Sequence, residues 1–143
     1  MLAAEELLLR MAAVLRQDIG PAVTDPFPRT QAFMGAVVLD KLSAQLRTAA
    51  AHERADRDDR AALAADLETL LVPDDPAELR DAVAALPVGA ASTAAEGAEA
   101  LNRLVLQLYV ARPGLGPVRF DRLLSRLRHT LRARLDRQLE VAS

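Results

Sequence analysis

The chain contains no cysteine and no tryptophan. The absence of cysteine excludes disulfides, thiolate catalysis, iron–sulfur clusters and cysteine-ligated zinc, and it fits a reducing compartment. We therefore expect a cytoplasmic protein, and no pattern predicts a cofactor. With 143 residues, of which 51% are hydrophobic, the chain has enough apolar side chain for one core. The expected organisation is a single domain over residues 1–143.

Residues that favour β-strands are also scarce. The chain has eleven valines, one isoleucine and 3% aromatic residues, against 29 alanines and 25 leucines. Alanine and leucine have high helix propensity, whereas β-branched and aromatic residues are enriched in strands. The composition therefore predicts an all-α fold, a compact helical bundle of about five to six helices.

Long hydrophobic runs and a strong charge of one sign are absent as well. No apolar run approaches the roughly 18 residues of a membrane span. Glu5 and Glu6 stand where a signal peptide would be positively charged. The net charge of −2 gives the chain no overall attraction to nucleic acid or anionic lipid. We expect neither export nor membrane insertion, and nucleic acid is not favoured as a partner.

Apolar residues at spacings of three and four predict the first two helices. The first spans residues 2–18 and ends before Gly20-Pro21, and a connector follows to Pro28, with Phe27 tucked inward. The second runs from Arg29 to about residue 52. It is apolar all round over residues 33–39, which predicts a place at the centre of the bundle. Its small residues Ala32, Gly35 and Ala36 predict close approach of another backbone.

Capping signals place the later helices. The charged segment 53–60 either continues the second helix or forms a turn, and a third helix follows up to Pro73. Asp75 as N-cap and Pro76 at the first helical position predict a fourth helix to about residue 86. A capping box of Thr93 and Glu96 begins a fifth helix that ends near residue 111. It is apolar nearly all round, which makes it the second central helix. A loop over 112–117 then precedes the last helix.

No residue pattern forms a complete catalytic or metal-binding signature. The two histidines, His52 and His129, lie far apart in sequence, and His129 falls on the solvent side of the last helix. Neither has an acid three residues before it, as a di-iron bundle requires, because Ala49 and Arg126 occupy those positions. The acids of segment 53–60 are interleaved with arginines that oppose cation binding. These features favour an exposed, solvated surface.

Two groups of residues are candidates for binding. Arg119, Arg122, Arg126 and Arg137 fall within about 60° of arc on the last helix, at about 100° per residue. This arginine stripe predicts either a solvated face, docking onto an acidic partner protein, or nucleic-acid binding. Arg29, Thr30 and Gln31 begin the second helix, where free N–H groups and an arginine predict an anion site.

The segment from Val14 to Val23, followed by Phe33-x-x-x-Val37-Val38-Leu39, resembles a group of small helical proteins of uncharacterised function. These proteins occur in bacteria alongside aminoglycoside-phosphotransferase-like kinases and acyl-CoA dehydrogenases. The resemblance covers roughly the first 45 residues. It implies an accessory subunit of a phosphotransferase-like protein, and it implies no catalytic residue.

The expected function is a non-enzymatic helical interaction module that associates with another protein or with itself. The contacts are expected at the arginine stripe or at the Arg29 end of the second helix. The alternative is a ligand-binding or enzymatic bundle with a pocket between the two central helices. The polar residues in or beside their apolar segments would line it: Asp40, Asn102, Gln107 and Tyr109.

Overall fold

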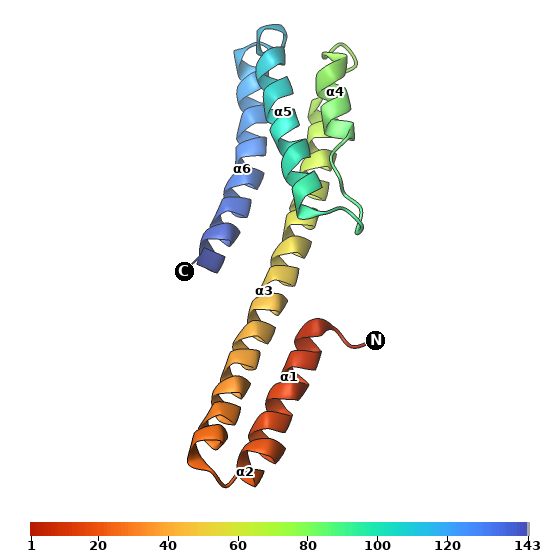
Figure 1. The fold of residues 1–143 in the computed structure, drawn as a ribbon. Coiled ribbons are helices and arrows are strands. Elements are labelled where there is room, and N and C mark those ends of the chain that lie inside the picture. Colours follow the sequence, from red (N-terminus) through yellow and green to blue (C-terminus); the bar gives the residue numbers. More distant parts are fainter. Residues whose placement is uncertain (143) are drawn as a thin grey trace. The chain divides into compact units, whose positions relative to one another are not determined.

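The computed structural model describes the backbone of residues 1–142 and the side chains of residues 1–140. Over these residues the chain is all-α, with no strand, which confirms the predicted fold class (Figure 1). The chain divides into two compact units, Met1–Ala51 and His52–Ser143, with the division inside one long helix. The expectation of a single domain stays a prediction.

The first unit is a helical hairpin. Its first arm consists of α1 (Ala4–Val14), a π-helical turn (Leu15–Ile19) and α2 (Gly20–Ala22). Its second arm is the beginning of α3 (Pro26–Leu70), which runs beside α1 in Figure 1. The prediction that Gly20-Pro21 ends the first helix is wrong, because the π turn carries the helix on to Ala22. There the backbone N–H of Val23 donates to the carbonyl of Ile19 at 3.1 Å.

The hairpin buries only small side chains between its arms. The buried residues of this unit are Ala12, Gly20, Ala36 and Ser43. The Ser43 hydroxyl donates to the backbone carbonyl of Glu5 at 2.8 Å, and so ties the two arms together. The predicted inward position of Phe27 is wrong, since 72% of this residue is exposed. Two helices cannot enclose a large side chain, whereas a bundle of four can.

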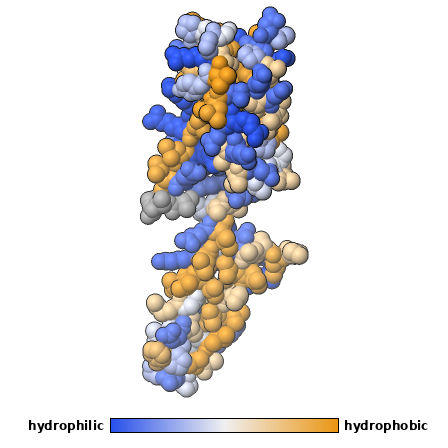
Figure 2. Space-filling view, turned by 45° about the horizontal axis from the view of Figure 1, so that its top comes forward, coloured by the Kyte–Doolittle hydropathy of each residue, from blue (hydrophilic) through white to orange (hydrophobic). Residues whose placement is uncertain are grey.

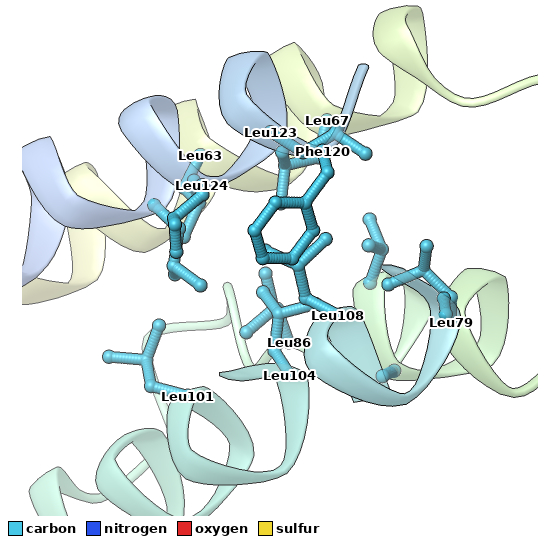
Figure 3. Close-up of a cluster of buried hydrophobic side chains, with 14 of the residues drawn as sticks. Leu63, Leu67, Leu79, Leu86, Leu101, Leu104, Leu108, Phe120, Leu123 and Leu124 are labelled. Atoms are coloured by element: carbon cyan, nitrogen blue, oxygen red, sulfur yellow. The ribbon is translucent and has the colours of Figure 1, made fainter. Parts of the chain in front are cut away.

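The second unit has a conventional leucine-rich core (Figure 3). It is built from the end of α3, α4 (Ala77–Ala84), α5 (Ala94–Leu115) and α6 (Pro117–Ala142). Leu63 of α3, Leu101 and Leu104 of α5 and Leu127 of α6 are at most 1% exposed. The void lined by Leu79, Leu104, Leu123 and Leu127 with their neighbours has a volume of only about 10 Å³, so these side chains fill the space between them.

Several predicted boundaries shift. Segment 53–60 continues α3, which settles the alternative left open by the sequence. Pro76 is the N-cap residue of α4, whereas Asp75 was predicted there. The capping box of Thr93 and Glu96 is confirmed by reciprocal hydrogen bonds of 3.2 Å. The predicted loop at 112–117 is wrong, because α5 continues through Pro113 to the buried Leu115 and ends only at Gly116, where φ is 76°.

Candidate interaction surfaces

The arginine stripe is held largely by acids of the same chain. Arg119 is the clearest case: its guanidinium donates to the two carboxylate oxygens of Asp75, at 2.6 and 2.8 Å, and to the carbonyl of Leu70 at 3.1 Å. The Asp75 carboxylate also accepts from the backbone N–H of Val72 at 2.7 Å. The hydrogen bond from Arg119 lowers the pKa of Asp75, and the same bond raises the pKa of Arg119.

Two further arginines of the stripe bind acids of α3. Arg126 donates to Asp66 at 2.6 Å and to the hydroxyl of Thr130 at 2.8 Å. Arg137 donates to both Asp56 and Asp59, at distances down to 2.6 Å. Burial alone would lower the pKa of Arg137, but its hydrogen bonds to the two aspartates outweigh that effect and raise it.

These ion pairs show that most of the arginine stripe is not an exposed, unpaired positive surface. Of the four, Arg122 is exposed and Arg119 is half-buried, and the side chains of Arg126 and Arg137 are 21% and 18% exposed. The stripe therefore joins α6 to the end of α3 and to the loop before α4. Partner binding through it stays a prediction, but the charge that it offers to an acidic partner is mostly neutralised within the chain.

The start of α3 differs from the anion site expected at Arg29, Thr30 and Gln31. The helix already begins at Pro26, so Gln31 lies beyond its first four residues. Of these, Pro26 and Pro28 have no N–H group, and the N–H of Arg29 donates to the carbonyl of Asp25 at 3.1 Å. The carboxylate of Asp25 accepts from the N–H of Phe27 at 3.2 Å, which places a negative charge at this end. Arg29 lies 6.0 Å from the ring centroid of Phe33, and Thr30 donates to the carbonyl of Pro26 at 2.9 Å. Anion binding here stays a prediction.

The polar residues proposed to line a pocket do not have the burial that the idea requires. Asn102 and Tyr109 are exposed on α5, and Gln107 is half-buried. The ring of Tyr109 packs edge-on against Phe120 at 5.3 Å. Asp40 belongs to the hairpin, where it binds Arg16 at 2.5 Å. The premise that these are buried polar groups is therefore wrong for Asn102 and Tyr109.

One arginine outside the predicted sets is buried. Arg60 of α3 is 3% exposed, and it donates to the carbonyl of Pro87 at 3.1 Å and to the hydroxyl of Ser92 at 3.4 Å. Desolvation lowers the pKa of its guanidinium, partly opposed by Asp56. Gly97 leaves room for this group, because an added Cβ would lie 2.4 Å from its Nη1. Arg60 thus ties the α4–α5 loop to α3, which is a structural role.

We next consider metal-binding groups, histidines and grooves among the described residues. Among them, no group of three or more acidic or histidine side chains is placed to hold a metal ion. His129 is exposed, as predicted, and His52 lies 3.5 Å from Glu140. An open depression of about 310 Å³ lies between the ends of α3 and α4, lined by Leu71, Val72, Arg80 and their neighbours. No helix in the described part of the chain is long and apolar enough to cross a membrane.

The hairpin, by contrast, exposes much apolar surface (Figure 2). Phe27, Met34 and Val38 on α3 are 72%, 60% and 53% exposed, and Leu7 and Met11 on α1 are 50% and 48% exposed. The all-round apolar run at 33–39 thus has only one side covered. Thirteen large hydrophobic residues of this unit are exposed: Met1, Leu2, Leu7, Leu9, Met11, Val14, Ile19, Phe27, Met34, Val37, Val38, Leu42 and Leu46.

The sequence contained a signal for this surface, namely a helix apolar on every side. The interpretation as a central helix assumed that other helices of the same chain would cover it.

Compared with known proteins, the chain matches no protein-family model, no curated protein and no solved structure.

Proposed function

We propose that this protein is a non-enzymatic helical interaction module whose binding element is the N-terminal hairpin. The observation that carries the proposal is the exposed apolar surface of a unit that buries no large side chain. Monomeric soluble proteins rarely expose contiguous apolar patches of more than a few hundred Å², and larger ones mark interaction sites. The hairpin gains a core only by association.

The properties of the second unit support the assignment of the hairpin as the binding element. The void within its leucine cluster is only about 10 Å³, and Arg119, Arg126 and Arg137 are engaged with acids of the same unit. It therefore supplies a folded support that presents the hairpin. The filled core and the exposure of Asn102 and Tyr109 also favour an interaction module over a ligand-binding bundle. An accessory role beside a phosphotransferase-like protein stays a prediction of the sequence resemblance.

Site-specific photo-crosslinking in the native host tests the proposal. A photoreactive amino acid replaces Val38 on the hairpin, and in the matched control it replaces Val88, which has nearly the same exposure, 52% against 53%. We expect the probe at position 38 to form an adduct of defined mass with a polypeptide, and the probe at position 88 to form none. Failure of position 38 to crosslink to any polypeptide, or equal adducts at both positions, would overturn the proposal.

A further inference from the structure

The exposed side of α3 in the hairpin has a palindromic spacing. Its outer face, as we call it, consists of seven exposed residues: Phe27, Gln31, Met34, Val38, Leu42, Gln45 and Ala49. Successive members are four, three, four, four, three and four positions apart, so the spacing reads the same in both directions from Val38. At about 100° per residue, Val38 lies about 160° from the buried Ala36, so this face points away from α1.

The chemistry of the outer face is palindromic too. Gln31 and Gln45 stand at equal distances on either side of Val38, and so do Met34 and Leu42. An interface with two-fold symmetry requires that residue i contacts residue j while j contacts i. In an antiparallel pair of α3 helices centred on Val38, glutamine meets glutamine and a large aliphatic side chain meets another. At the ends Phe27 meets the small Ala49.

Contacts within the hairpin show which side is apolar. The Leu15 side chain comes nearest to Gly35 on one side, whereas the ion pair of Arg16 with Asp40 lies on the other. Met11 is one turn before Leu15, and Leu42 is two turns after Gly35, so both lie on the Leu15 side. Apolar side chains of α1 therefore adjoin the outer face on its Leu42 side.

The charge of the hairpin fits self-association. Residues 1–51 hold five acidic and five basic side chains, a net charge of zero. On the helical wheel no charged residue of residues 27–49 falls within the outer face, and Lys41 is the nearest, about 20° beyond Met34. Two copies therefore meet without net repulsion, and a neutral apolar face offers no attraction to anionic lipid or nucleic acid.

The exposed apolar area adds to this argument. A half-exposed large apolar side chain offers roughly 40 Å² of apolar area. Six such side chains on or beside the outer face therefore supply on the order of 250 Å², about half of the apolar part of an interface that buries about 800 Å² per partner. The six residues are Met11, Phe27, Met34, Val38, Leu42 and Leu46.

We infer that the occupant of this face is a second copy of the chain, paired antiparallel through α3 about Val38, so that the exposed apolar side chains of α3 are buried between the two copies. This inference rests on the proposed function and names the partner.

Sedimentation velocity of the purified protein over a range of concentrations tests the pairing. We expect a dimer, and we expect Val38→Lys to shift it to monomer because the two-fold axis brings the two introduced charges together. Val38 is 53% exposed, so helicity by circular dichroism should not change. Val88→Lys is the matched control and should remain dimeric. A wild-type protein that is monomeric throughout overturns the inference.

Cysteine crosslinking tests the direction of pairing, because the natural chain has no cysteine. Met34→Cys mixed with Leu42→Cys should form a disulfide-linked dimer on mild oxidation, whereas each variant alone should form little. A dimer in which each variant links to itself would show parallel pairing and overturn the antiparallel arrangement. If the purified protein is monomeric while the photoreactive probe at position 38 captures another polypeptide, the second-copy inference fails and the proposed function stands. If the purified protein is monomeric and the probe at position 38 captures no polypeptide, the second-copy inference and the proposed function both fail.

Discussion

At the scale of single residues, Asp75 shows how one carboxylate can organise a junction. It is 6% exposed and binds Arg119 through both oxygens, while the backbone N–H of Val72 completes its hydrogen bonds. Asp75 lies in the loop between α3 and α4, two residues after Pro73. A buried charge with this many donors is costly to leave without its partner.

Asp75→Asn should destabilise the second unit at neutral pH by about 2 kcal/mol, because the neutral amide loses the ionic bond to the partly exposed Arg119. The pKa of Asp75 is lowered in the folded state, so its stabilisation is present above the unfolded pKa of about 3.9. This stabilisation is lost as the pH falls from there through the folded pKa.

Urea unfolding of wild type and Asp75→Asn at pH 7, and then at steps below pH 4, measures this effect. The difference in unfolding free energy between them should shrink as the pH falls. A constant difference at every pH would mean that the ionised carboxylate is not the source of the stability.

At the scale of elements, two glycines of the hairpin differ in how much space surrounds them. A Cβ on Gly20 would lie 2.9 Å from both the carbonyl oxygen of Leu15 and the ring of Phe33. A Cβ on Gly35 would meet only the flexible side chain of Leu15, at 3.4 Å. The close approach of another backbone predicted at Ala32, Gly35 and Ala36 stays a prediction, and of these two glycines Gly20 is the more tightly packed, because the π turn brings the backbone of the first arm near Phe33.

Gly20→Ala should lower the free energy of local opening of α1 by about 1 kcal/mol, because backbone at Leu15 must move. Gly35→Ala should leave it unchanged or raise it by up to about 1 kcal/mol, since alanine favours a helix interior. Hydrogen exchange of the α1 amides measures both. An equal effect of the two substitutions would contradict the packing described at Gly20.

At the scale of the whole molecule, the two units differ in what holds them together. The second unit buries large leucines, whereas the hairpin buries alanine, glycine and serine. Local stability follows buried apolar area, so the hairpin should depend on association and the second unit should not.

Amides of α1 should therefore exchange at least about 100-fold faster than those in the middle of α5 when the protein is dilute. Raising the protein concentration should slow exchange in the hairpin and leave α5 unchanged. Hydrogen exchange followed by mass spectrometry at two concentrations provides the measurement. Equal protection of α1 and α5 in dilute protein would show that the hairpin is stable by itself.

The arginine stripe marks the limit of prediction for the candidate sites. The helical wheel placed Arg119, Arg126 and Arg137 on one side of the last helix, but their acidic partners lie 44 to 81 positions away in sequence. No local pattern pairs residues that far apart. The exposed apolar run at 33–39 was visible in the sequence, but whether the rest of the chain covers it depends on the tertiary arrangement.

The sequence by itself determined the helical class, the capping box at Thr93 and most helix positions, because propensity, apolar spacing and capping act over a few residues. Only the tertiary structure decided that segment 53–60 continues α3, that Arg119 binds Asp75 and that the hairpin buries only small side chains between its arms. These outcomes depend on which distant residues come together, and each is a small free-energy balance over contacts that no short segment contains.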